Sequence, residues 1–161
     1  MAKKIGYGLA AALVLIAAAL VLLYRTIHGE EWDKRADAVT TVTYSTYIRT
    51  VDRVETFVGD APYRIVFGKD AEGRPAIAWV GDDGTHMEYE SAGVSEAAIR
   101  EKVMAQNADN DILRILPGVL DGTYVWEALY KRKEEDGTRY YYGYYRFDNG
   151  AEIDTWRMTK R

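Results

Sequence analysis

Side chains that could support catalysis are scarce in this sequence. It contains two histidines, His28 and His86, and no cysteine. His86 follows Asp82 and Asp83 and precedes Glu88, and this set of nitrogen and oxygen donors could bind a metal ion. The Asp-Asp-Gly segment is also typical of a β-hairpin turn, in which backbone geometry accounts for both residue types. We therefore expect a turn here, with no metal site and no cofactor.

Two further sets of carboxylates do not indicate a metal site or a catalytic site either. The acidic residues 134–136 lack the alternating oxygen ligands of a calcium loop and directly follow the basic residues 131–133, so a solvated hairpin tip is expected. Paired carboxylates for glycoside hydrolysis need a sugar-binding cleft, and chance alone yields some pairs among 25 acidic residues. We expect no catalytic residues, and we predict that the protein is not an enzyme.

Aromatic residues gather in the segment 139–147. Strict alternation in a strand divides them between two faces: Tyr141, Tyr145 and Phe147 on one, and Tyr140, Tyr142 and Tyr144 on the other. Gly143 shares the first face and would let a helix approach closely, so we expect that face to point inward with Trp126 and Tyr130. The second set would point outward, either as ordinary cover of the sheet or as a partner-binding surface.

The elements that must carry these residues occur in a repeated order. A helix over about 30–50, with Trp32, Ala36, Val39 and Thr43 at helical spacing, precedes four strands, and a helix after Ser95 precedes four more. Alternation and turn signals place the strands near 51–58, 63–67, 77–79 and 87–89, and near 112–116, 124–131, 139–147 and 152–158. Superposing the two Gly turns at Gly84 and Gly150 gives a repeat spacing of 66 residues. An α+β fold follows, in which each half is one helix packed on a curled antiparallel sheet of about four strands.

The N-terminal segment is predicted to cross a membrane. Residues 5–24 carry no charge and would span about 30 Å as a helix. Lys3 and Lys4 precede this segment and Arg25 follows it, and the distribution of positive charge favours a cytoplasmic N-terminus. We expect residues 1–4 in the cytoplasm, a single transmembrane helix in contact with membrane lipid, and the remaining residues outside the cytoplasm.

The formal net charge and the absence of cysteine argue against several other classes of partner and site. The chain has 21 basic and 25 acidic residues, a formal net charge of -4, which argues against nucleic acid as a partner. Without cysteine there is no disulfide framework and no lipid-modified cysteine. Any membrane anchor must then be the polypeptide itself.

Three segments resemble a known family. Residues 51–59 (VDRVETFVG), residues 124–127 (YVWE) and the short N-terminal apolar segment are similar to the TseB-like (YpmB-like) cell-wall elongation regulators of Gram-positive bacteria. The resemblance implies two tandem PepSY-like (cystatin-like) domains, residues 25–91 and 92–161. It also implies a penicillin-binding transpeptidase of peptidoglycan elongation as the partner. The sequence departs from the common PepSY pattern at Arg146, where an aspartate is often found, so a role for that aspartate is not carried over.

Three classes of function remain open: an anchored binding and regulatory module, an extracytoplasmic enzyme, and a passive tether. The PepSY resemblance adds protease modulation, by analogy of fold alone. We favour the regulatory module. The candidate partner-binding residues are the outward tyrosines and three residues of the first repeat: Tyr140, Tyr142, Tyr144, Arg53, Glu55 and Arg64.

Overall fold

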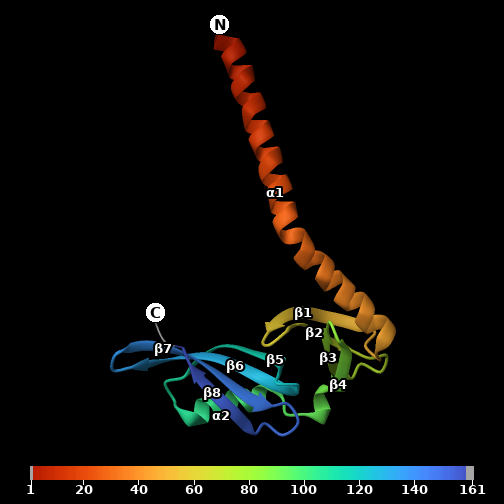
Figure 1. The fold of residues 1–161 in the computed structure, drawn as a ribbon, viewed down its shortest axis with the longest axis vertical. Helices are drawn as coiled ribbons and strands as arrows, with labels where there is room; N and C mark the ends of the chain where they lie inside the picture. The colour runs from red at the N-terminus through yellow and green to blue at the C-terminus, as the bar shows by residue number, and fades with distance from the viewer. Residues whose placement is uncertain (1, 159–161) are drawn as a thin grey trace. The chain divides into compact units, whose positions relative to one another are not determined.

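The computed structural model describes residues 2–158, apart from the side chains of residues 2–13 and 25–31. Its helices are α1 (Ala2–Ser45), the short 3-10 helix η1 (Glu90–Ala92) and α2 (Glu96–Gln106). The strands are β1 (Thr50–Val58), β2 (Pro62–Lys69), β3 (Pro75–Gly81), β4 (Gly84–Tyr89), β5 (Asp111–Leu120), β6 (Thr123–Glu134), β7 (Gly137–Arg146) and β8 (Glu152–Arg157). They form two four-stranded antiparallel sheets with orders β1-β2-β3-β4 and β5-β6-β7-β8 (Figure 1). The α+β class and the eight strands agree with the sequence-based expectation.

The predicted transmembrane helix is contradicted by the structure. Residues 5–24 lie within α1, but among the described residues no helix is apolar over a length sufficient to cross a membrane. The predicted single-pass location, with a cytoplasmic N-terminus, is contradicted with it. The predicted flanking residues Lys3, Lys4 and Arg25 lie outside the residues whose side chains are described.

The chain divides into two compact units, Met1–Asp37 and Ala38–Arg161. Both sheets belong to the second unit. The domain boundary predicted between residues 91 and 92 falls inside this unit, and the division into domains 25–91 and 92–161 stays a prediction.

The first sheet is covered on one face by the last turns of α1. Ala38 and Val42 of the helix, together with Ile48, pack on an apolar cluster that includes Val66 and Ala78. The helix ends at Ser45, because the Thr46 hydroxyl donates to the Val42 carbonyl oxygen (2.7 Å) and accepts from the Ile48 amide (3.1 Å). This end comes about five residues earlier than predicted, in a segment rich in strand-forming threonine and tyrosine.

The helical face that packs on this sheet also differs from the prediction. The expected set contained Val39 and Thr43, whereas the buried residues are Ala38 and Val42. The two sets are offset by one residue, which rotates the helical face by about 100°. The sequence signal was weak because small residues and threonine occupy both faces.

The turn between β2 and β3 is held by one buried carboxylate. Asp70 accepts hydrogen bonds from the Glu72 amide (3.0 Å), the Arg74 amide (2.8 Å), Arg74 Nε (2.6 Å) and the Tyr89 hydroxyl (3.0 Å). Burial by itself would raise the pKa of Asp70, but these hydrogen bonds outweigh it and lower the pKa to about 2. The carboxylate therefore stays ionised and joins the turn to β4.

The second sheet is covered by α2. The Ser95 hydroxyl caps the helix by accepting from the Ala98 amide (3.2 Å), as predicted, and Ile99 and Val103 are buried. Strand β5 continues through Pro117 to Leu120, although proline was expected to end it. Proline is accommodated because β5 is an edge strand, so only one side of it needs ladder hydrogen bonds.

The two sheets share one apolar core, which includes Phe57 and Trp79 from the first and Tyr145 from the second. The Phe57 ring packs directly on the backbone of Gly118 in β5: a Cβ atom added there would lie 2.3 Å from a ring carbon. The turns after β1 and β5 are also joined, since the Asp121 amide donates to the Asp60 carboxylate (3.1 Å).

The hairpin of β6 and β7 extends beyond its sheet. Strand β5 pairs with β6 only as far as Lys131, and β8 pairs with β7 only from Tyr141. The residues beyond, from Arg132 paired with Arg139 to Glu134 paired with Gly137, form a two-stranded overhang. Strand β6 has 12 residues, whereas β2 at the equivalent place in the first sheet has 8.

Candidate functional site

The aromatic strand β7 has the phase that alternation predicted. Tyr145 is 0% exposed, and Tyr141 and Phe147 are also buried, in the core that contains Trp126 and Tyr130. The rings of Tyr130 and Tyr141 stack with centroids 5.3 Å apart. The opposite set of tyrosines therefore belongs to the outer face of the second sheet.

The three outer tyrosines differ in exposure. Tyr140 is 43% exposed and Tyr142 is half-buried, but Tyr144 is only 6% exposed. Tyr144 lies in a small apolar cluster with Leu120 and Val125, which cover that end of the face. The expectation that Tyr144 is an exposed contact residue is therefore wrong.

The buried carboxylate of Glu127, which pairs with the exposed Arg114, binds the Tyr144 hydroxyl. Its hydroxyl donates to Glu127 Oε2 (3.3 Å), and Glu127 Oε1 pairs with Arg114 Nη2 at 2.7 Å. Burial, followed by the charge of Glu127, raises the pKa of the Tyr144 hydroxyl. These groups satisfy one another, so we assign them to sheet stability.

Strand β8 and the residue after it add exposed side chains to this face that the sequence did not indicate. Trp156 is directly opposite Tyr142 in the ladder, and the Met158 amide donates to the Tyr140 carbonyl oxygen (2.9 Å). Trp156 and Met158 are each 49% exposed. We call Tyr140, Tyr142, Trp156 and Met158 the outer patch. Alternation along 152–158 could have indicated Trp156, had the register of β7 and β8 been known.

The Trp156 ring is held by two contacts. Its indole Nε1 donates to Asp154 Oδ2 (2.5 Å), and the ring meets Tyr144 edge to face with centroids 4.9 Å apart. A large ring that is half exposed but already oriented loses little freedom on binding a partner. The outer patch is therefore a partly exposed aromatic surface whose largest ring is held in place.

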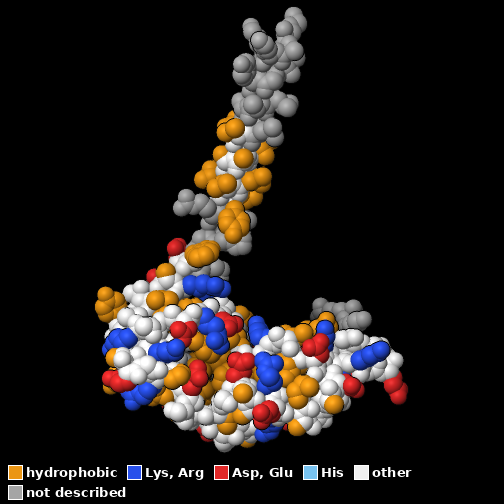
Figure 2. Space-filling view, turned by 180° about the vertical axis from the view of Figure 1, so that it is seen from behind, with side chains coloured by type: hydrophobic (Ala, Val, Ile, Leu, Met, Phe, Trp, Pro, Cys, Tyr) orange, Lys and Arg blue, Asp and Glu red, His pale blue; other side chains and the backbone are white. Residues whose placement is uncertain are grey.

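The first-repeat candidates do not form one group. Arg53 and Glu55 share a face of the first sheet and are joined by a 3.0 Å ion pair, with Arg53 Cζ 3.6 Å from the centre of the Phe67 ring. Arg64 lies opposite Thr56 in the ladder, so alternation places it on the other face. Figure 2 shows acidic and basic side chains interspersed with apolar ones on the face drawn there, without a large region of a single sign.

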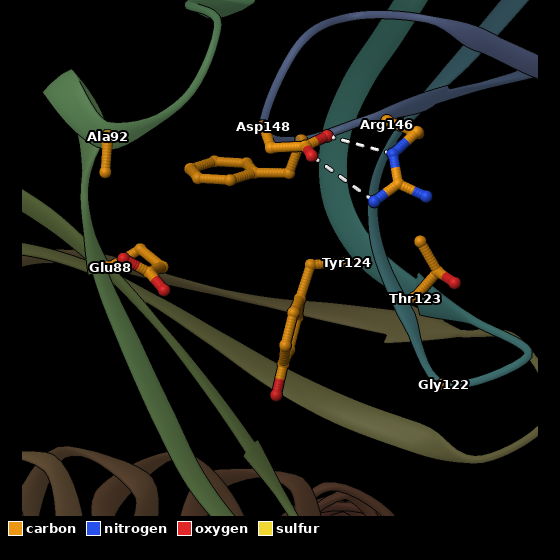
Figure 3. A pocket seen from close by; sticks show the side chains of 8 residues that line it. Glu88, Ala92, Gly122, Thr123, Tyr124, Arg146 and Asp148 are labelled. Carbon is orange, nitrogen blue, oxygen red and sulfur yellow. Dashed lines mark hydrogen bonds and ion pairs between the residues drawn. The ribbon is translucent and has the colours of Figure 1, made fainter.

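A pocket that the sequence did not reveal lies where the two sheets meet. It has a volume of about 340 Å³ and is lined by Glu88, Ala92, Gly122, Thr123, Tyr124, Arg146, Phe147 and Asp148 (Figure 3). We call it the junction pocket. A second pocket of about 270 Å³, lined in part by Trp79 and His86, shares Tyr124 with it. The lining comes from β4, from η1, from the β5–β6 turn with the start of β6, and from the end of β7 with the two residues after it. No local pattern in the sequence unites these segments.

Backbone hydrogen bonds fix the walls of the junction pocket. The Val94 amide donates to the Phe147 carbonyl oxygen (2.9 Å), and the Phe147 amide donates to that of Tyr124 (3.0 Å). Trp126 Nε1 donates to the Val94 carbonyl oxygen (2.9 Å). The segment that links the two sheets is thereby bound to the second sheet beside the pocket.

The charges of the pocket are unevenly compensated. Arg146 binds Asp148 through two contacts, Nε to Oδ1 (3.0 Å) and Nη2 to Oδ2 (3.3 Å). The hydrogen bond with Arg146 lowers the pKa of Asp148, and the same bond raises the pKa of Arg146. Glu88 lies on the other side of the space, with Oε1 3.1 Å from His86 Nε2 (Figure 3).

Tyr124 forms the aromatic wall of the junction pocket. Its ring stacks on His86, with centroids 4.1 Å apart and an angle of 14° between the planes. Burial raises the pKa of the Tyr124 hydroxyl, and the charges of Tyr63 and Glu88 act in the same direction.

Of the residues considered for metal binding, Asp82 and Asp83 lie in a hairpin turn, and His86 and Glu88 lie in β4. Asp82 and Asp83 connect β3 to β4, and Gly84 has a φ of 134°, a conformation suited to glycine. Within the part of the chain that the structure describes, no group of three or more His, Cys, Asp or Glu side chains could hold a metal ion.

Comparison with known proteins finds one matching family and a similar solved structure. Residues 37–81 match the family described as "Cell wall elongation regulator TseB-like domain". Among solved structures, the YpmB protein from Bacillus subtilis superposes with a TM-score of 0.66 at 23% sequence identity, covering 74% of this chain and 94% of that chain. A comparison with curated protein sequences finds no significant match.

These findings confirm the expected resemblance at a coarse level. The fold is similar to that of YpmB, and the family match covers the end of α1 and strands β1 to β3. The tandem PepSY-like assignment stays a prediction.

Proposed function

We propose that this protein is a non-catalytic regulator of cell wall elongation that acts by binding a penicillin-binding transpeptidase. The process is inferred from the TseB-like domain match over residues 37–81. The choice of a transpeptidase as partner follows the family resemblance of the sequence. The observation that carries a binding role is the outer patch, with exposed aromatic and methionine side chains on one sheet face.

The outer patch has the composition of an interface centre. Trp, Tyr and Met are enriched in protein interfaces, and a few such residues commonly supply most of the binding energy. Tyr140 and Trp156 are the two exposed rings of the patch, and the ion pair of Arg114 with Glu127 supports the sheet beneath them. In this proposal Tyr140 and Trp156 contact the partner, and Tyr144 supports the surface.

The test is crosslinking of the full chain to the elongation transpeptidase in living cells. The double variant Tyr140→Ser with Trp156→Ser should remain folded and lose most of the crosslinking. The matched control is Tyr44→Ser with Tyr47→Ser, which also removes two exposed rings, 88% and 69% exposed, far along the chain from the patch.

Crosslinking at the original level in the patch variant would reject the outer patch as the contact surface. Arg53, Glu55 and Arg64 would then be the next residues to change. Failure of the unaltered chain to crosslink to any transpeptidase would reject the proposed partner itself.

A further inference from the structure

We propose that the outer patch binds an edge β-strand of a partner protein, in which a glycine lies between aliphatic residues. The inference rests on the proposed function in one respect, that the outer patch is the contact surface, and it does not require the partner to be a transpeptidase. The first sheet shows what such a face binds, because its equivalent face is covered by a strand of the second sheet.

The two sheets have the same internal geometry. The first strand of each has one bulge at its third residue, Asp52 in β1 and Leu113 in β5. Beyond the bulges the two ladders match position by position. One row of directly opposed residues in the first sheet is Arg53, Phe67, Ile77 and Glu88, and the equivalent row in the second sheet is Arg114, Leu129, Tyr142 and Trp156.

The helices lie on equivalent faces of the two sheets. In the first sheet α1 packs on the cluster that contains Val66. In the second sheet α2 packs on the cluster that contains Ala128, which has the same place in its ladder as Val66. The face turned away from the helix is therefore the one with Phe67 in the first sheet and the one with Tyr142 in the second.

The two faces turned away from the helices differ in their cover. In the first sheet Phe67 is 5% exposed and Ile77 is 0% exposed. In the second sheet the equivalent residues Leu129 and Tyr142 are half-buried, and Trp156 is 49% exposed. The first face is thus closed within the chain, whereas the second is open in the part of the chain that the structure describes.

Strand β5 is the element that covers the first sheet. It is an edge strand of the second sheet, and its Leu116 and Val119 belong to the same core cluster as the covered face. Its ladder partner is β6, so it meets the first sheet by packing. At Gly118 the Phe57 ring lies on the strand backbone, where a Cβ atom would be 2.3 Å from a ring carbon. This face therefore accepts an edge strand whose glycine leaves room for a protruding ring.

The outer patch presents a protruding ring of the same kind. The Trp156 ring is fixed by its hydrogen bond to Asp154 and by its contact with Tyr144. Because interface centres pack as densely as protein cores, a strand laid over a fixed ring needs a gap opposite it, and glycine provides one. Aliphatic neighbours of that glycine would cover Tyr142 and remove apolar surface from water.

The experiment is photo-crosslinking of the full chain in living cells, with p-benzoylphenylalanine in place of Tyr140. Mass spectrometry maps the crosslinked residue in the captured protein, and we expect it in an edge strand, beside a glycine. The matched control carries the same group in place of Tyr44, which is 88% exposed, and should not capture that strand.

Each outcome decides between this inference and the proposed function. Capture of a transpeptidase through a helix or a loop would overturn the edge-strand inference and leave the proposed function standing. Capture of a different protein through an edge strand would do the reverse. Capture of a second copy of this chain, or no capture, would overturn both.

A change in the captured strand tests the fit to the ring. Replacing its glycine by valine should lower crosslinking about fivefold or more, because the added side chain overpacks the contact with Trp156. With Trp156→Ala the ring is gone, so the same change should lower crosslinking about twofold or less. Alanine in place of the glycine serves if the valine variant of the partner is not folded. An equal loss with and without the Trp156 ring would overturn the proposal.

Discussion

The contact between Phe57 and Gly118 predicts a strong stability coupling between the two sheets. A Cβ atom at Gly118 would lie 2.3, 2.4 and 2.5 Å from three carbon atoms of the Phe57 ring, well inside ordinary contact distance. The ring is 1% exposed, and its other side approaches Gly59, so it has little room to move. Gly118→Ala should therefore overpack the junction.

The expected cost follows from two opposing effects. Overpacking of a well-filled core typically costs about 1–3 kcal/mol. Replacing glycine by alanine at a backbone conformation that alanine accepts stabilises by about 0.4–1 kcal/mol, because the unfolded chain loses freedom. The net loss should be about 1–2 kcal/mol, which for a unit of this size lowers the melting temperature by about 4–8 °C.

A double-mutant cycle measured by urea unfolding shows whether the cost of Gly118→Ala comes from overpacking against the Phe57 ring or is independent of that ring. Phe57→Leu alone should cost about 1–2 kcal/mol, because it leaves a cavity. In that background the ring is gone, so Gly118→Ala should cost about 0.5 kcal/mol or less. The control is Gly73→Ala, where φ is +81° and no atom lies within 4 Å of the added Cβ. Its cost comes from backbone strain alone and should be the same in both backgrounds. If Gly118→Ala costs the same with and without the Phe57 ring, the reasoning fails.

Two further predictions concern single side chains. Tyr145→Ser should lower the free energy of unfolding by about 3–5 kcal/mol, because it removes a buried ring. Tyr140→Ser, at a partly exposed ring, should change the free energy of unfolding by about 0.5 kcal/mol or less. Similar losses for both variants in urea unfolding would contradict the assignment of Tyr145 to the inner face and Tyr140 to the outer face. The folded-state pKa of Asp70 is about 2, below its usual value of 3.8, so Asp70 contributes stability above pH about 4 and this contribution is lost as the pH falls toward 2. Asp70→Asn should flatten that part of the pH profile of the melting temperature, and an unchanged profile would show that the buried carboxylate has no such role.

Local patterns predicted the elements of the fold well. Alternation and turn residues placed all eight strands, and Ser95 marked the start of α2. The phase of β7 was also right, because glycine at position 143 distinguished the two faces of an otherwise uniformly aromatic strand. In these cases the signal lies within one element.

Features that depend on a neighbouring element were missed. Tyr144 was expected to be exposed, and what buries it is the cluster formed with Leu120 and Val125 from other strands. Pro117 was expected to end a strand, and only the edge position of β5 explains why it does not. The outer role of Trp156 requires the register between β7 and β8. The junction pocket needs four separate segments in their final places, so no single stretch of sequence could indicate it.

The apolar segment near the N-terminus is a case in which a strong local pattern led to a prediction that the structure contradicts. Its length and lack of charge predicted a membrane span over residues 5–24, and that prediction is contradicted.

The stability of the overhanging β6–β7 hairpin should depend on ionic strength. A two-stranded hairpin is marginal by itself, and this one is joined to the sheet by charged contacts. Glu134 accepts from the Tyr141 hydroxyl and pairs with Arg157 (3.1 Å), and Arg132 Cζ lies 4.6 Å from the centre of the Tyr141 ring. Exposed charges are screened within about 8 Å at physiological salt, whereas apolar burial is not weakened in this way. Added salt should therefore loosen the hairpin tip while the shared core of the two sheets stays intact.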